Sequence, residues 1–332
     1  SPALLELLNT KEDLLPGAIL YLRVYFLGMP ALALYNFGNA VFSAIGETKK
    51  PLAYLSFAGV LNILLNLFFV IVCKLDVAGV ALASTIAQCV SAGLILHALT
   101  KVSDCYALDF RKVRLDLNMT KRILMLGVPA GLQNAIFAIA NLFIQAGVNS
   151  FDSLMVKGNS AAANSDAMIY DAMAAFYMAC ASFMSQNYGA GKWKRMDKVL
   201  RNCILLSVVV SLILGGGSYL FGPELLKIYT SDPKVIQCGM EILLYTTVTY
   251  FMCGLMDLFP GALRGMGYSA IPMLLSIIGT VGTRIVWIFM IFPHHRSLDV
   301  LFISYPASWL ITIILQVICY FFVRKRIHNP LP

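Results

Sequence analysis

Long apolar segments dominate this sequence and constrain its fold more than any other feature. The nine segments that hold about 20 or more mostly apolar residues are 20–45, 52–73, 77–99, 124–149, 161–187, 202–222, 239–266, 270–293 and 301–323. A helix of about 20 apolar residues crosses the roughly 30 Å hydrocarbon core of a bilayer. Backbone polar groups have no partner in lipid, so each segment must satisfy them internally as a helix. The sequence therefore predicts an all-α integral membrane protein, a polytopic helical bundle with nine transmembrane helices.

Composition and charge exclude a soluble protein. AVILMFWYC residues make up 59% of the 332 residues and DEKR residues only 13%, whereas soluble domains have roughly 45–50% apolar and about 25% charged residues. The net charge of +8 could attract nucleic acid, but the basic residues lie between the apolar segments. We therefore expect the lipid bilayer as a partner and no nucleic acid. The eight cysteines are scattered without metal-ligand spacing, which predicts neither a metal site nor structural disulfides.

The distribution of basic residues between the apolar segments predicts the orientation. Alternate connections on one side of the expected membrane hold seventeen Lys and Arg residues, counting Arg264 as a loop residue, and those on the opposite side hold six. Cytoplasmic loops of multi-pass proteins carry the excess of basic residues. The sequence thus predicts a multi-pass protein of the cell (plasma or inner) membrane with a cytoplasmic C-terminus.

An internal repeat with an offset of 221 residues relates the two ends of the chain. SPALLELLNT (1–10) aligns with GPELLKIYTS (222–231), and the same register aligns FSAIGETKKPL (42–52) with LRGMGYSAIPM (263–273) without a gap. Segments 42–52 and 263–273 each contain a helix end with small residues, a short loop and a proline at the start of the next span. The match of turns at both ends of one register indicates a duplicated bundle.

The repeat predicts two lobes. Residues 1–116 are expected to hold the end of an N-terminal lobe, with three transmembrane helices and a cytoplasmic linker. Residues 117–332 are expected to form a complete C-terminal lobe of six helices. In this register three further helices would precede residue 1, which makes twelve in two pseudo-symmetric six-helix lobes. Parallel repeats of this kind occur in secondary transporters that work by alternating access around a central cavity.

Six sequence phrases resemble, in family order, the multidrug and toxin extrusion (MATE) family of the multidrug/oligosaccharidyl-lipid/polysaccharide flippase superfamily. They are 21–52, GVLNILLNLFFVIV (59–72), VAGVALASTIAQ (77–88), VPAGLQNAIFAIANLFIQAGVNSF (128–151), SFMSQNYGAGK (182–192) and GALRGMGYSAIP (261–272). The resemblance implies a chain similar to the family's helices four to twelve. It also implies efflux of cationic or amphiphilic small molecules, driven by inward H⁺ or Na⁺, with no other cofactor.

Charged residues within the apolar segments are the first candidates for function, because a charge at membrane depth costs a few kcal/mol. Asp257 lies ten residues from the loop at Gly267, and in the repeat register it aligns with Asn36. It also matches an acidic position of the MATE pattern. A carboxylate in a low dielectric can load a proton or ligate Na⁺, so Asp257 is the predicted coupling residue. The alternative is a carboxylate held in a structural ion pair.

Asp166 begins a stripe along one helical face and resembles an acidic position of the family. Tyr170, Met173 and Tyr177 follow it at roughly helical spacing. A carboxylate beside aromatic rings and a thioether suits flat lipophilic cations through charge, cation–π contact and adaptable packing. The stripe is therefore a predicted second cation site and drug surface, with ordinary helix packing as the alternative.

Asp171 lies roughly 140° around the helix from Asp166, where the family pattern tends to have an uncharged residue. Its depth matches that of Arg284 when both are counted from the outer helix ends. We therefore predict an Asp171–Arg284 ion pair, either structural or a gate. The amides Asn36, Gln133 and Asn134, which lie within apolar segments, are predicted to line the substrate cavity, with interhelical hydrogen bonding as the alternative.

Taken together, the residues favour a cation-coupled antiporter that exports drugs and toxins by alternating access, acting as a monomer. The closest alternative is a lipid-linked precursor flippase of the same superfamily, which should display several cavity arginines. An intramembrane enzyme would need catalytic or metal-ligand motifs such as H-E-x-x-H or G-x-S-x-G, and none occurs. No catalytic residues are therefore assigned. A non-transporting receptor would have no need of buried carboxylates.

Overall fold

The computed structural model describes residues 15–328, and every regular element in that range is helical. Contacts divide the chain into two compact units at Leu115 and Asp116. The helices of the first unit are α2 (Leu15–Leu27), α3 (Met29–Ala44), α4 (Lys49–Leu67), η1 (Phe68–Val72) and α5 (Asp76–Thr100). This architecture confirms the predicted all-α class.

The second unit contains the remaining helices. They are α6 (Leu117–Val148), α7 (Ser153–Gly189), α8 (Trp193–Leu220), α9 (Gly222–Lys227), α10 (Pro233–Thr247), α11 (Tyr250–Gly265), α12 (Ala270–Ser276), η2 (Ile277–Gly282), α13 (Thr283–Val286), η3 (Trp287–Ile291) and α14 (Leu298–His328). The η segments are π-helical and continue the α-helices beside them, so that Ala270–Ile291 forms one membrane-length helix.

The nine predicted transmembrane segments are recovered within residues 15–328. Seven helices are long and apolar enough to cross a membrane, and two bent pairs, α2 with α3 and α10 with α11, bring the number to nine. Many large apolar side chains, such as Phe57, Ile213 and Phe321, are exposed on the helices. A soluble protein would bury such side chains, whereas a lipid environment leaves no reason to do so.

The 221-residue repeat appears in the backbone of each unit. The turn after α3 and the turn after α11 both place a glycine in the left-handed region, Gly46 at φ +83° and Gly267 at φ +91°. In each turn the residue after the glycine donates its N–H to the carbonyl five residues earlier, at 2.9 Å. This is the Schellman motif, which favours glycine because it has no Cβ. The repeat segment at 1–10 lies outside the described residues.

The same register relates the two bent spans. The α2–α3 pair bends by 41° at Gly28, and the α10–α11 pair bends by 43° at Val248 and Thr249. Gly28 and Thr249 are 221 residues apart, so the break recurs at the repeated position. Pro30 follows the first break at the start of α3. In the second span, by contrast, the proline at 260 lies inside α11, away from the bend.

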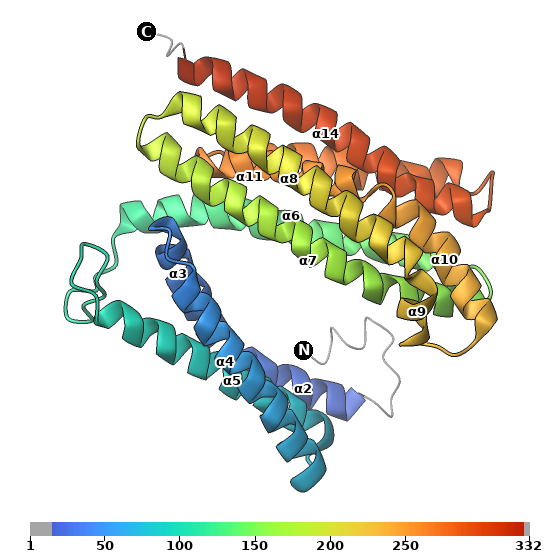
Figure 1. The fold of residues 1–332 in the computed structure, drawn as a ribbon, viewed down its shortest axis with the longest axis horizontal. Coiled ribbons are helices and arrows are strands. Elements are labelled where there is room, and N and C mark those ends of the chain that lie inside the picture. The colour runs from blue at the N-terminus through green and yellow to red at the C-terminus, as the bar shows by residue number, and fades with distance from the viewer. Residues whose placement is uncertain (1–14, 329–332) are drawn as a thin grey trace. The chain divides into compact units, whose positions relative to one another are not determined.

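Helix α7 organises the second unit. It packs against α8, α10 and α11, and Figure 1 shows α7 and α8 running side by side. The contact with α11 is close enough to require glycine: a Cβ at Gly265 would lie 2.6 Å from the carbonyl oxygen of Ala181. Beside this contact, Cys180, Met184 and Leu258 are fully buried in one hydrophobic cluster. Small residues at such interfaces are the usual means by which membrane helices approach each other.

Candidate functional site

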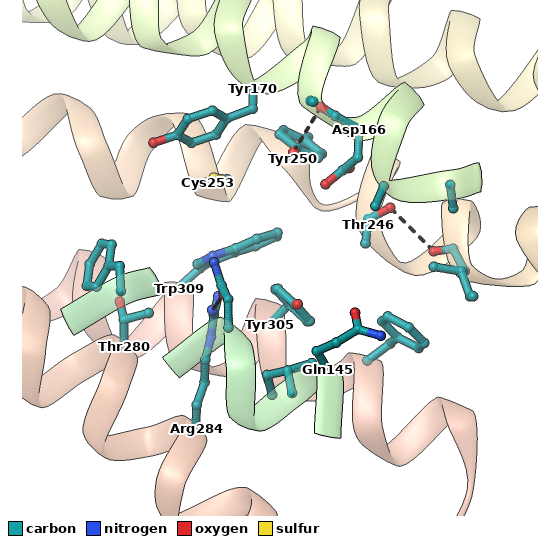
Figure 2. A pocket seen from close by; sticks show the side chains of 18 of the residues that line it. Gln145, Asp166, Tyr170, Thr246, Tyr250, Cys253, Thr280, Arg284, Tyr305 and Trp309 are labelled. Carbon is teal, nitrogen blue, oxygen red and sulfur yellow. Dashed lines mark hydrogen bonds between the residues drawn. The ribbon is translucent and has the colours of Figure 1, made fainter. Parts of the chain in front are cut away.

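The second unit encloses a cavity of about 560 Å³ (Figure 2). Its walls come from α6, α7, α10, α11, η2, α13 and α14. The lining of α6 comes from its C-terminal half and that of α7 from its N-terminal half, so the cavity lies toward the turn that joins them at 149–152. This volume is within the range of pockets that hold drug-sized ligands.

One wall of the cavity is acidic. Asp166 on α7 and Asp257 on α11 both line it, and neither forms an ion pair with any residue in the described range. The Oδ1 atom of Asp166 is buried and has no hydrogen-bond partner among those residues. The hydroxyls of Thr246 and Tyr250 lie beside this carboxyl group, and the Tyr250 hydroxyl donates to the Asp166 backbone carbonyl at 3.3 Å.

Asp257 is partly buried, and its neighbours include a neutral phenol and a positively charged guanidinium. It interacts electrostatically with the Tyr170 phenol, which also lines the cavity, and with the Arg264 guanidinium. Arg264 forms no ion pair with it: that side chain donates from Nη1 to the Tyr177 hydroxyl at 2.8 Å and from Nη2 to Gln133 Oε1 at 2.7 Å. The Asp257 carboxylate is therefore left without a bonded cation within residues 15–328.

The other wall of the cavity carries a buried cation. Arg284 is only 5% exposed. Its Nε donates to Ser308 Oγ at 3.3 Å and its Nη1 to Asn141 Oδ1 at 2.7 Å. The guanidinium carbon lies 4.3 Å from the ring centroid of Tyr305, a cation–π contact. Figure 2 shows Tyr305 and Trp309 beside Arg284, so this wall combines one positive charge with aromatic rings.

The predicted Asp171–Arg284 ion pair is wrong. Asp171 is exposed and does not line the cavity, whereas Arg284 is buried with the neutral partners Asn141 and Ser308. The depths of the two residues agree, but depth says nothing about rotation around the helix axis. Asp166 points into the cavity, and Asp171, roughly 140° further round α7, therefore points away from it.

Only the beginning of the predicted α7 stripe reaches the cavity. Asp166 and Tyr170 line it. Met173 is buried in the protein core, where the Ser207 hydroxyl lies 3.8 Å from its sulfur. Tyr177 accepts the hydrogen bond from Arg264. Beyond Tyr170 the stripe therefore takes part in helix packing, because α11 covers that stretch of α7.

The three predicted cavity amides lie in three different environments. Asn134 lines the cavity. Gln133 is buried and accepts from Arg264, and Asn36 is exposed on α3 in the first unit. Gln133 lies about 100° around α6 from Asn134, and this rotation directs it to Arg264 rather than to the cavity.

Sequence reasoning missed two features of this region. Arg264 was counted as a loop charge, but it lies in the last turn of α11 and joins α6 to α7 through Gln133 and Tyr177. The aromatic wall of Tyr305 and Trp309 was also missed. These two residues are four apart in α14, a spacing that places both on one helix face.

Comparisons with known proteins agree with this fold. A family model described as MatE matches residues 1–68 and 129–290. The "Probable multidrug resistance protein YpnP" of Bacillus subtilis (strain 168) is 30% identical over 279 residues, which cover 84% of this chain and 62% of that protein. The "Probable multidrug resistance protein YoeA" of the same strain is 24% identical over 334 residues, 97% of this chain and 72% of that protein.

The fold also matches solved structures. One, described as the outward-facing conformation of a multidrug resistance MATE family transporter of the MOP superfamily, superposes with a TM-score of 0.88 at 18% identity. The match covers 99% of this chain and 74% of that one. This chain therefore spans between 62% and 74% of the length of these three proteins.

Proposed function

The chain belongs to the MatE family, and we propose that it acts as a secondary antiporter that exports cationic or amphiphilic small molecules in exchange for H⁺ or Na⁺. Two of its relatives, YpnP and YoeA, are named as probable multidrug resistance proteins, which supports this activity. We further propose alternating access in the cell membrane, with a cytoplasmic C-terminus, by a monomer. The family assignment argues for a transporter and against an enzyme.

The observation that carries the proposal is the pair of carboxylates without ion-pair partners in one aromatic-lined cavity. Asp166 and Asp257 share the cavity with Tyr170, Tyr250 and Trp309. A carboxylate at membrane depth is costly unless a cation or a proton neutralises it. A coupling ion and a cationic substrate would therefore compete for the same carboxylates. Such competition makes the two bind in alternation, which is the requirement for antiport.

Four residues that line the cavity are proposed to bind the coupling ion and the substrate. Asp257 is proposed to hold the coupling H⁺ or Na⁺, and Asp166 to attract the positive charge of the substrate. Tyr170 and Asn134 are proposed to contact the substrate, since both line the cavity. The lining of the same cavity argues against a flippase for pyrophosphate-linked lipids, because Arg284 is the single Lys or Arg among the described residues that form it.

Dye efflux from everted membrane vesicles tests this assignment. Efflux is measured under a proton gradient and, separately, under a sodium gradient. We expect Asp257→Asn and Asp166→Asn to lower gradient-driven efflux by at least about tenfold, because a lost charge interaction of about 1.4 kcal/mol has this effect. Asp171→Asn is the matched control, since it removes a carboxylate from the same helix as Asp166 but outside the cavity.

Two results would reject the assignment. Efflux that survives both cavity substitutions would remove the carboxylates from the mechanism. An equal loss with Asp171→Asn would mean that any acidic residue of α7 supports activity and that the cavity has no special role. A response to one of the two gradients alone would identify the coupling ion.

A further inference from the structure

Arg284 is a buried cation without a counter-ion. Its two hydrogen-bond acceptors, Asn141 Oδ1 and Ser308 Oγ, are neutral, and no described carboxylate pairs with it. A guanidinium has more N–H donors than these two acceptors can satisfy, and within the described range Nη2 has no acceptor. A buried charge left in this condition is destabilising until an anion approaches it.

Asp166 lies across the same cavity from Arg284. Figure 2 shows Asp166 and Tyr170 on one side and Arg284 with Trp309 on the other. Neither Arg264 nor Arg284 forms an ion pair with a described carboxylate, since all their hydrogen-bond partners are neutral. The cavity thus keeps its positive and negative groups apart, although pairing them would relieve the burial cost of each. Aromatic rings border the space between them.

We infer that Arg284 is the anion-binding residue of this cavity and that it selects substrates that carry a carboxylate over those that do not. The carboxylate would bind Arg284, and a positive group of the same substrate would face Asp166. The flat apolar body would lie against Tyr305 and Trp309. This inference rests on the proposed function and deepens it, because it assigns the residue that recognises a negative group on the substrate.

The geometry of Arg284 supports a carboxylate over a hydroxyl or a carbonyl. Hydrogen bonds between charged partners are roughly twice as strong as neutral ones, and the planar guanidinium presents parallel N–H groups to the two oxygens of a carboxylate. The neutral bonds from Nε and Nη1 and the Tyr305 ring hold the plane of the group in place. Nη2 has no acceptor among the described residues, and Arg284 lines the cavity. The guanidinium is therefore preorganised, which lowers the entropy cost of binding.

A matched pair of dyes tests this inference. Rhodamine 6G is a cationic ethyl ester, and its free acid has the same fluorophore but is a zwitterion at neutral pH. Binding of both dyes to the purified protein in lipid nanodiscs is measured by fluorescence polarisation. We expect the protein to bind the acid more tightly than the ester. Arg284→Gln should weaken binding of the acid by at least about tenfold. It should not weaken binding of the ester, which has no carboxylate and is repelled by the guanidinium.

Two further variants serve as controls. Arg296→Gln removes a positive charge from an exposed residue of the second unit that does not line the cavity, and it should change neither affinity. Arg284→Lys keeps the charge but loses the planar pair of donors, so it should weaken binding of the acid less than Arg284→Gln does. If Arg284→Gln does not fold, the preference of the unmodified protein and the Arg284→Lys result still decide.

The outcomes separate the inference from the proposed function. If the unmodified protein binds the ester at least as well as the acid, or if Arg284→Gln weakens both dyes equally, the anion-binding role of Arg284 is overturned while drug binding stands. If the unmodified protein binds neither dye, the proposed function fails and this inference fails with it. A preference for the acid that disappears in Arg284→Gln alone supports the inference.

Discussion

Two adjacent glycines of α8 offer a sharp test of how the second unit is packed. Gly215 is buried, and a Cβ added to it would overlap the backbone carbonyl oxygen of Thr247, the last residue of α10. Gly216 is exposed, and a Cβ there would meet no atom within 4 Å. Gly215→Ala and Gly216→Ala therefore add the same methyl group to the same helix, one against the α10–α11 bend and one facing outward.

The structure indicates the size of the difference. Overpacking of a buried site costs about 1–3 kcal/mol, and the upper end applies at Gly215 because the obstructing atom belongs to the backbone. Replacing glycine by alanine in a helix gains about 0.5–1 kcal/mol. Gly215→Ala should thus destabilise the protein by about 2 kcal/mol, and Gly216→Ala should stabilise it by about 0.5–1 kcal/mol. The gap of about 3 kcal/mol corresponds to roughly 6–12 °C in melting temperature for a unit of this size.

Thermal unfolding in mild detergent, followed by tryptophan fluorescence, measures this gap, since Trp309 is buried in the affected unit. Dye binding provides a second readout. Thr246 and Tyr250 flank the bend and line the cavity, so Gly215→Ala should also weaken binding of cavity ligands. Equal melting temperatures for Gly215→Ala and Gly216→Ala, or a lower one for the exposed site, would refute the close approach of α8 to the bend.

Three other substitutions probe stability by different mechanisms. Asp197→Asn should cost about 1–2 kcal/mol in unfolding free energy. Arg324 pairs with both Asp197 oxygens at 2.9 Å, but the Asp197 side chain is 54% exposed, which limits the effect. Additive losses in a double-mutant cycle with Arg324→Gln would contradict this coupling. Thr312→Val should cost about 1–2 kcal/mol in unfolding free energy, and more than Thr280→Val. Thr312 donates to the Ser308 carbonyl as well as contacting Thr280, and it keeps the first bond when Thr280 is replaced. Equal losses in chemical denaturation would count against this order. Gly267→Ala should cost about 1–2 kcal/mol through its φ of +91° alone, since nothing obstructs a Cβ there; an unchanged melting temperature would show that the turn adapts.

The transmembrane segments could be predicted because each depends on its own residues. The length and apolarity of a segment decide whether it crosses the bilayer, and its backbone bonds close within the segment. The turns after α3 and α11 were predictable for the same reason, since Gly46 and Gly267 each support a local motif. The π-helical continuations and the bend at Val248 and Thr249 had no comparable signal in the sequence.

The sequence predicted the charged residues of the candidate site but only some of the other residues that form it. Asp257, Asp166 and Arg284 stood out because a charge within an apolar segment is visible without a structure. Their common cavity was not visible. The expected partner of Arg284, Asp171, turned out to point away, and Gln133 proved to bind Arg264 instead of lining the cavity.

The amino-acid sequence by itself determined the helices, their number and the repeated turns, because hydrogen bonds within a helix and the thickness of the bilayer act on one segment at a time. The tertiary structure decided which polar groups meet. A change of one residue turns a side chain by about 100° around its helix, so the rotation of each helix against its neighbours selects the facing residues. That rotation follows from close contacts such as Gly265 against α7 and Gly215 against α10, which bring together segments far apart in the chain. The resulting packing brings Asp166, Asp257 and Arg284 to one cavity, with Asp166 and Arg284 on opposite sides of it (Figure 2).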